Sequence, residues 1–187
     1  MPVLTWPQDG EWLRAHVLSG GVFAYATEAV FGLGGHPGMA RAVKAILQIK
    51  AGRSAAQGMI LVAGAPAQAQ GFVRGVDAAD WQKMLAAQER RATTFLLPAG
   101  EKVAADVVVD GKVALRLSRH AQLAEVTAFL GFPLLSTSAN RHGEPPARSV
   151  AEVLAAFPDM VVLAGDTGGE ARPSRVLDYA SGQILRE

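Results

Sequence analysis

The chain has 187 residues, of which half are apolar, and its formal net charge is +1. This length suffices for one core of ordinary size, so residues 1–187 are expected to form a single domain. The sequence contains no cysteine, which excludes disulfides, thiolate metal sites and cysteine nucleophiles.

Targeting and membrane segments are not expected. No basic N-terminal region is followed by an apolar core, and no apolar run approaches the roughly 20 residues of a membrane span. The sequence therefore predicts a cytoplasmic protein without a membrane segment.

The first predicted element is a helix that ends near Leu18. Asp9 is a candidate N-cap, and Trp12, Leu13 and Val17 are expected together on one apolar side of this helix. A glycine pair then stops it.

The segment from Val22 to Arg53 is predicted to be a strand, a glycine-rich loop and a helix. Val22 to Ala26 is a short apolar run typical of a buried strand. Thr27 follows and enters a loop with glycines at 32, 34 and 35. The helix-period segment after the loop ends in Lys50. Polar groups from these elements would meet at one rim of a sheet, where open α/β sheets bind ligands.

The middle of the chain is predicted to hold two strands around a helical region. Residues 59–63 (MILVA) form an apolar run typical of a buried strand. Residues 65–90 are expected to be helical in two pieces, with Asp77 as the cap of the second piece. Residues 93–98 (TTFLLP) predict the next strand.

A hairpin is predicted next, with Asp110-Gly111 as the turn between VVV and KVALRL. Ser118 is expected to cap a helix that Gly131 ends. A short strand then leads into a polar loop at 136–140 (STSAN).

The C-terminal part is predicted to contain one more helix, one strand and a last hairpin. Ser149 and Glu152 form a capping box for a helix that runs to about Phe157. MVVLAG predicts a strand, and VLDYASGQILR predicts the hairpin. Strands that alternate with helices early and hairpins later indicate an α/β domain with a mixed sheet flanked by helices.

Two basic side chains at the end of the second predicted helix are candidate anion ligands. Lys50 falls on the apolar side of its helix, where an ammonium group is costly unless it is paired. Arg53 offers a planar fork of donors that matches phosphate oxygens, so the two residues could clamp a triphosphate. The alternative for Lys50 is an interaction with the C-terminal end of the helix dipole.

Three further polar sites have two interpretations each. Arg116 lies inside an apolar strand and needs an anionic or carbonyl partner, unless it is a sheet-edge arginine in water. The loop at 136–140 can donate to phosphate or ribose oxygens, or its groups satisfy the loop's own backbone. The hydroxyl of Thr27 faces either a ligand or the neighbouring backbone.

Arginines gather in or beside these segments, although the net charge is small. They are Arg116, Arg119, Arg141, Arg148, Arg172 and Arg175. A basic site suits a polyanionic ligand such as ATP or an RNA backbone. The four histidines lack metal-ligand spacing, and no Walker phosphate loop or Gly-x-Ser-x-Gly motif occurs, so a protein-bound zinc site and a serine hydrolase are not predicted.

Two blocks of the sequence resemble the YrdC/TsaC-like family of threonylcarbamoyl-AMP synthases. The first, GGVFAYATEAVFGLGGHPGMARAVKAILQIKAGR at Gly20 to Arg53, is similar to that family's glycine pair, strand ending in Pro-Thr, Gly-Leu-Gly loop and Lys-x-Arg. The second, STSANRHGEPP at Ser136 to Pro146, resembles its Ser-x-Asn element. Weaker matches follow the same order: VALRLSRH, GDTGG and PSRVLDYASGQILRE.

The resemblance implies a YrdC-like twisted mixed sheet flanked by helices. It also implies a nucleotidyltransferase that forms threonylcarbamoyl-AMP and pyrophosphate from L-threonine, bicarbonate or CO2, and ATP with Mg2+. Downstream tRNA threonylcarbamoyl-transfer proteins would place the threonylcarbamoyl group on an adenosine beside the anticodon of certain tRNAs.

The resemblance also marks the site residues. Those marked as catalytic are Lys50, Arg53 and Arg116, with Arg116 associated with the threonine carboxylate. Those marked as substrate- or nucleotide-binding are Thr27, Thr94, Ser136, Ser138, Asn140 and Ser174. No residue is marked as a metal ligand.

The sequence departs from the family pattern in four places. Ala26 replaces the proline before Thr27, Lys-x-Arg is one residue longer at Lys50–Arg53, Gln57 replaces a basic residue, and Glu89–Ala92 stands where Trp-Pro-Gly-Pro is usual. A fold tolerates such changes more readily than an activity does. Two other hypotheses are a non-catalytic relative that binds RNA or ribosomal particles through a basic concave surface, and an ATP- or AMP-binding protein with another acceptor.

Overall fold

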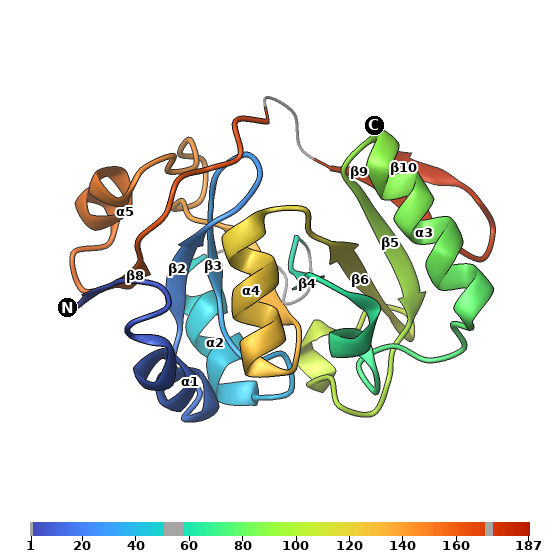
Figure 1. Cartoon of the computed structure of the whole chain (residues 1–187), viewed down its shortest axis with the longest axis horizontal. Coiled ribbons are helices and arrows are strands. Elements are labelled where there is room, and N and C mark those ends of the chain that lie inside the picture. The colour runs from blue at the N-terminus through green and yellow to red at the C-terminus, as the bar shows by residue number, and fades with distance from the viewer. Residues whose placement is uncertain (1, 51–57, 171–173) are drawn as a thin grey trace.

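The computed structural model describes residues 2–50, 58–170 and 174–187, and among these residues ten strands form one mixed sheet (Figure 1). The strand order is β1-β8-β2-β3-β7-β4-β6-β5-β9-β10. The strands are β1 (Val3–Leu4), β2 (Phe23–Ala26), β3 (Phe31–Gly34), β4 (Ile60–Ala63), β5 (Thr93–Pro98), β6 (Lys112–Leu117), β7 (Leu134–Ser138), β8 (Val161–Leu163), β9 (Arg175–Asp178) and β10 (Ile184–Arg186). The expected α/β fold with a mixed sheet is confirmed.

The helices pack around this sheet. They are α1 (Gly10–Leu18), α2 (Ala40–Ile49), α3 (Ala78–Arg90), α4 (Ala121–Leu130) and α5 (Val150–Ala156), with short 3-10 turns η1 (Pro66–Ala69) and η2 (Ala105–Val107). In Figure 1, α3 and α4 lie in front of the sheet, where α3 contacts β5 and α4 contacts β4. Helix α2 contacts β3 and η2, and α5 contacts β8. Among the described residues, no helix has the length and apolar character needed to cross a membrane.

Strand β2 contributes to two buried clusters, because successive side chains of a strand point to opposite faces. Phe23 and Tyr25 belong to the larger core, together with residues of β4, β6 and α4. Ala24 and Ala26 belong to a smaller core that also contains Val153 of α5. The sheet is therefore covered on both faces at the β2 end.

Strand β6 has the same alternation but only one covered face. Val113, Leu115 and Leu117 are buried in the larger core. Lys112, Ala114 and Arg116 are half-buried, and they line a cavity on the other face. Half of the strand therefore serves the fold, and the other half is available for a ligand.

The predicted glycine loop after Thr27 is wrong, because residues Phe31–Gly34 form strand β3, antiparallel to β2. A Cβ added at Gly34 would lie 2.2 Å from the carbonyl oxygen of Leu135 and 2.6 Å from the ring of Tyr25. A close approach of backbones explains this glycine, so glycine here marks tight packing inside a strand.

Two predicted helix caps are corrected by the structure. Asp9 precedes α1, but its Oδ2 accepts from the N–H of Thr5 (2.7 Å), and it makes no cap hydrogen bond. Residue His120 caps α4 in place of Ser118, because Nδ1 of His120 accepts from the N–H of Leu123 (3.3 Å). The hydroxyl of Ser118 is used elsewhere, as described below.

The position of Trp12 also differs from the prediction. Trp12 is 46% exposed and stacks on His16, so it does not join Leu13 in the core.

The predicted turn at Asp110-Gly111 is confirmed, with φ of 50° and 74° at these residues. The VVV segment before the turn forms no strand beyond a single bridge from Val109 to Lys112, and β6 pairs instead with β5 and β4. The caps at Asp77 and Ser149 are confirmed.

Candidate functional site

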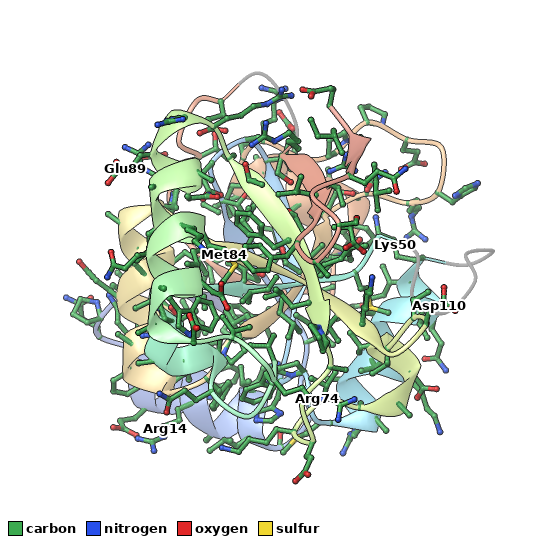
Figure 2. All side chains as sticks on the ribbon, turned by 90° about the vertical axis from the view of Figure 1, so that its right-hand side faces the viewer. Arg14, Lys50, Arg74, Met84, Glu89 and Asp110 are labelled. Atoms are coloured by element: carbon green, nitrogen blue, oxygen red, sulfur yellow. The ribbon has the colours of Figure 1, made fainter. Side chains whose placement is uncertain are left out.

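A cavity of about 860 Å³ lies over the uncovered face of the sheet. Its floor consists of residues that are paired across neighbouring strands and therefore share a face: Thr94 with Arg116, Leu96 with Ala114, and Ile60 with Ser136. Figure 2 shows Asp110, which lines the cavity, and Lys50 on the opposite side of the molecule from Glu89 of α3. The cavity thus lies behind the sheet in the view of Figure 1.

Lys50 is the C-cap residue of α2 and is 3% exposed. Its Nζ donates to Oδ1 of Asn140 (2.6 Å), to the carbonyl oxygen of Asn140 (2.9 Å) and to Oγ of Ser138 (3.4 Å). Ser138 lines the cavity and also donates to Oδ1 of Asn140 (2.6 Å). The structure thus brings together Lys50, Ser138 and Asn140, three of the residues predicted for the site.

The loop that carries Asn140 is held by its own side chain. The Nδ2 of Asn140 donates to the carbonyl oxygens of Arg141 (3.0 Å) and Glu144 (2.7 Å). The interpretation that this polar loop satisfies its own backbone is confirmed for the amide nitrogen, and the amide oxygen contacts Lys50. Donation from the loop to phosphate or ribose oxygens stays a prediction. Such a loop is pre-organised, which lowers the cost of binding a ligand.

A second polar group lies at the β5 and β9 side of the cavity. The hydroxyls of Thr94 and Ser174 are 2.8 Å apart, and both residues are buried. The Nη2 of Arg186 donates to the carbonyl oxygen of Ser174 (2.8 Å), and Arg186 lines the cavity. The predicted residues Thr94 and Ser174 are therefore in contact, and Arg186 is a cavity residue that sequence reasoning missed.

Arg116 is the penultimate residue of β6 and belongs to the cavity floor, and its side chain is 12% exposed. Its Nη2 lies 3.0 Å from Oε2 of Glu28. Oε1 of Glu28 accepts from the hydroxyl of Ser118 (2.7 Å) and from the N–H of Arg119 (3.1 Å). The expectation that Arg116 needs an anionic partner is confirmed, and the partner is a protein carboxylate.

Sequence reasoning also missed Glu28. Burial raises the pKa of this carboxyl, but the Arg116 guanidinium and the bonds from Ser118 and Arg119 outweigh burial and hold the pKa below its ordinary value. Glu28 is therefore ionised at neutral pH. The available signal was its position between Thr27 and an apolar run, since a carboxylate there has to be paired.

The hydroxyl of Thr27 donates to the carbonyl oxygen of Val30 (2.7 Å), so the backbone interpretation of this residue is correct for its hydroxyl. Thr27 also lines the cavity, as Ser136 does. Arg53 and Arg172 lie outside the described residues, as do the departures at Gly52 and Gln57.

The other predicted arginines differ in position. Arg148 lines the cavity. Arg141 points elsewhere: its guanidinium lies 5.4 Å from the ring centre of Phe157, and it donates to the carbonyl oxygen of Ala156 (3.1 Å). Arg119 donates to the carbonyl oxygen of Glu89, away from the large cavity. Only part of the predicted basic cluster therefore faces the site.

The far end of the cavity carries an ion pair between Lys112 and Asp178. The hydrogen bond from Lys112 is the largest cause that holds the pKa of Asp178 below its ordinary value. Between this pair and Arg116, the floor is apolar at Leu96 and Ala114. The cavity thus offers cationic and hydroxyl donors at one end and an apolar surface next to them, which suits a ligand with anionic groups and a flat apolar part.

No cluster of three or more His, Asp or Glu side chains that could hold a metal ion occurs among the described residues. The donors of the site are cationic side chains, hydroxyls and an amide. These groups can orient anions and stabilise developing negative charge, which requires no protein nucleophile.

Comparisons with known proteins support one family. The Sua5_yciO_yrdC family, which carries the description "Telomere recombination", matches residues 16–187. A threonylcarbamoyl-AMP synthase of Dichelobacter nodosus is 50% identical over 181 residues, which cover 96% of this chain and 95% of that protein. A threonylcarbamoyl-AMP synthase of Laribacter hongkongensis is 44% identical, with 92% and 93% covered.

A solved structure shows the same fold. The crystal structure of P. abyssi Sua5 complexed with L-threonine matches with a TM-score of 0.79 and 22% sequence identity. The match covers 95% of this chain and 54% of that Sua5 chain, so this chain spans about half of its length. With the family match over most of the sequence and relatives of similar length at 44–50% identity, the chain belongs to the Sua5/YciO/YrdC family.

Proposed function

We propose that this chain is a threonylcarbamoyl-AMP synthase, a nucleotidyltransferase that makes threonylcarbamoyl-AMP and pyrophosphate from L-threonine, bicarbonate or CO2, and ATP. The observation that carries the proposal is that polar and cationic side chains from two different strands line one cavity. Ser138, with Lys50 behind it, lies on β7, and Arg116 lies on β6. Only β4 separates these strands, so their backbones are about 10 Å apart.

The two groups suit the two anionic reactants. Lys50, Ser138 and Asn140 would contact the phosphates of ATP, with Arg53 as a further phosphate ligand. Arg116 would bind the carboxylate of threonine, and the hydroxyls of Thr27, Thr94, Ser136 and Ser174 would position the substrates. The names of the relatives support this assignment of substrates.

The reaction needs positioning more than side-chain chemistry. The neutral amine of threonine adds to CO2, and its nitrogen loses one proton to water, which gives a carbamate. A carbamate oxygen attacks the α-phosphorus of ATP, the bond to the β-phosphate oxygen breaks, and pyrophosphate leaves. Lys50 stabilises negative charge on the phosphates, and the cavity walls hold the two anions against each other, which replaces an unfavourable encounter in water.

Magnesium would enter bound to the ATP phosphates. Mg2+ in phosphate-transfer sites usually keeps several waters and takes one or two carboxylates in addition to substrate phosphates. The described residues of the cavity contain Asp110 and Asp178 as carboxylates but no cluster that would hold the ion alone. Magnesium supplies charge neutralisation on the leaving pyrophosphate when it is bound.

The proposal extends to the setting of the reaction. Residues 1–187 would act as a single domain in the cytoplasm. The product would pass to tRNA threonylcarbamoyl-transfer proteins, and binding of tRNA itself would be secondary to the reaction with the small substrates.

The test is to incubate the pure protein with ATP, Mg2+, bicarbonate and L-threonine, and to follow pyrophosphate release together with the mass of threonylcarbamoyl-AMP. We expect product that requires threonine, is much reduced with L-serine, and disappears in Arg116→Ala. Folded protein that binds ATP but forms no product would overturn the proposal. Strong, salt-dependent RNA binding by such an inactive protein would favour the hypothesis of a non-catalytic relative that binds RNA or ribosomal particles.

A further inference from the structure

Glu28 is a buried carboxylate at the edge of the site that has no part in the proposed reaction. It follows β2 by two residues, and its side chain is 8% exposed. Strands β3, β7 and β4 separate β2 from β6 in the sheet, yet the Glu28 side chain reaches β6 and the residues directly after it. It therefore links two parts of the molecule that are not neighbours in the sheet.

The carboxylate is held in place by three groups from one short segment. Oε1 accepts from the hydroxyl of Ser118 and from the N–H of Arg119, and Oε2 lies beside Nη2 of Arg116. Because all three groups belong to residues 116–119, the carboxylate is fixed relative to the strand that carries Arg116. A group fixed in this way can define the orientation of a side chain.

The backbone of Glu28 is held as well. Its carbonyl oxygen accepts from the N–H of Glu170 (2.9 Å), and the preceding carbonyl of Thr27 accepts from the N–H of Gly168 (3.0 Å). A Cβ added at Gly168 would lie 3.1 Å from Cα of Glu28, so the two segments are in close contact. Glu28 is therefore fixed at both its backbone and its carboxylate.

One donor of Arg116, its Nε, is buried and has no hydrogen-bond acceptor among the described residues. Its Nη2 forms an ion pair with Oε2 of Glu28 (3.0 Å), an oxygen that likewise has no hydrogen-bond donor among these residues. A buried N–H without a partner costs free energy, and a carboxylate that enters the cavity beside Thr94 would supply the acceptor. Arginine binds carboxylates best through two parallel N–H groups, so the orientation of the guanidinium decides how well it does so.

We propose that Glu28 is a positioning residue, which holds the guanidinium of Arg116 by Nη2 so that its Nε edge receives the carboxylate of the amino-acid substrate. This inference rests on the proposed function for the identity of that substrate. The effect of Glu28 is orientation and not attraction, since its negative charge repels another carboxylate. Orientation of Arg116 by Glu28 raises the affinity for threonine, whereas repulsion by its charge lowers it. The direction in which KM for threonine changes in Glu28→Gln therefore shows which effect is larger.

The first experiment compares KM values for L-threonine and for ATP in wild type, Glu28→Gln and Ser118→Ala. Exposed Glu125 on α4 offers a matched control, Glu125→Gln. We expect Glu28→Gln to raise KM for threonine at least tenfold and to leave KM for ATP within twofold. Ser118→Ala should shift KM for threonine in the same direction by a smaller factor.

Three results would overturn the inference: an unchanged KM for threonine in Glu28→Gln, a lowered one, or an equal rise for both substrates. A lowered value would mean that Glu28 competes with the substrate for Arg116. Thermal unfolding of each variant shows whether the protein is folded at the assay temperature.

The second experiment does not depend on turnover. In ¹⁵N-labelled protein, the Nε–H signal of Arg116, assigned by its loss in Arg116→Lys, should be narrow and slow to exchange with water in wild type. It should broaden or disappear in Glu28→Gln and persist in Glu125→Gln. A signal that is unchanged in Glu28→Gln contradicts the positioning role, whether or not the protein makes threonylcarbamoyl-AMP. An inactive wild type with the expected signals would overturn only the proposed function.

Discussion

The Nζ of Lys50 lies 2.6 Å from Oδ1 of Asn140, although the two residues are 90 positions apart in the sequence. One comes from the end of α2 and the other from the loop after β7. Contact between them joins the two sequence blocks that carry the family resemblance. The ammonium group is buried and donates to three acceptors, so it is held in one position.

Replacing Lys50 should abolish most of the activity. Lys50→Met keeps the length of the side chain but removes a charge that can bond to phosphate, and hydrogen bonds to charged groups contribute about 1.5–3 kcal/mol each. We expect pyrophosphate release to fall by about 100-fold or more. The matched control is Lys44→Met, an exposed lysine on the same helix, which should retain nearly full activity. Similar rates in both variants would remove Lys50 from the mechanism.

The pair of hydroxyls at Thr94 and Ser174 should contribute to stability. Thr94→Val keeps the shape of the side chain but removes its hydroxyl, which leaves the buried Ser174 hydroxyl without this partner. We expect a loss of about 1 kcal/mol in the free energy of unfolding. Urea denaturation of Thr94→Val, of Ser174→Ala and of the double variant measures this loss. The double variant should lose less than the sum of the two single losses, because both remove the same bond. A fully additive result would show that the two hydroxyls act independently.

An added methyl group at Gly34 should destabilise the sheet. In Gly34→Ala the Cβ would lie 2.2 Å from the carbonyl oxygen of Leu135, a backbone atom that cannot turn away. The expected cost is at least about 2 kcal/mol in unfolding free energy, because overpacking shifts the backbone. Gly10→Ala on α1 is the control, since its Cβ would meet only ring carbons at 3.2 Å or more. Equal stability of the two variants would show that β3 and β7 adapt without strain.

The stability of the protein should depend on pH through Glu28. The pKa of its carboxyl is lower in the folded protein than the ordinary value of 4.5, so folding favours the ionised form. This contribution is fully present above about pH 4.5 and is lost as the pH falls through the folded-state pKa. Glu28→Gln should therefore be less stable than wild type near pH 7, and the difference should shrink below pH 4. Urea denaturation at both pH values tests this, and a difference that does not change with pH would contradict it.

Periodicity predicted most of the elements, because helices and strands of this chain bury a regular apolar face. Strand β5 and the helices α3 and α5 lie close to where spacing and capping residues placed them. Strand β3 was missed although Phe31 and Leu33 alternate toward the smaller core, because Gly32 and Gly34 between and after them are typical of a loop. The close packing that explains Gly34, against Leu135 and Tyr25, forms only in the folded sheet. Strand β1 has only two residues and depends on its pairing with β8.

The site was predicted in part for similar reasons. Local patterns marked Lys50, which falls on the apolar side of its helix, and Arg116, which lies inside an apolar strand. The family resemblance marked both of these residues and Asn140. Neither could mark Glu28 as the partner of Arg116, because that contact forms only when the sheet places the end of β2 near the end of β6. Arg186 was missed because no local pattern distinguishes it from an ordinary surface arginine. Its position at the cavity depends on the pairing of β10 with β9.

The insertion of β8 between β1 and β2 has a consequence for protein synthesis. Val3 pairs with Val162, and Phe23 pairs with Val161. Strands β1 and β2, which are synthesised before β8, are therefore joined only when residues near 161–163 have also left the ribosome. The edge of the sheet that contains β1, β8 and β2 can therefore form only after most of the chain has been synthesised. Such pairing between residues far apart in the sequence makes folding slow. Until then β2 has an open hydrogen-bonding edge, which is a point where nascent chains can associate with one another or with a chaperone.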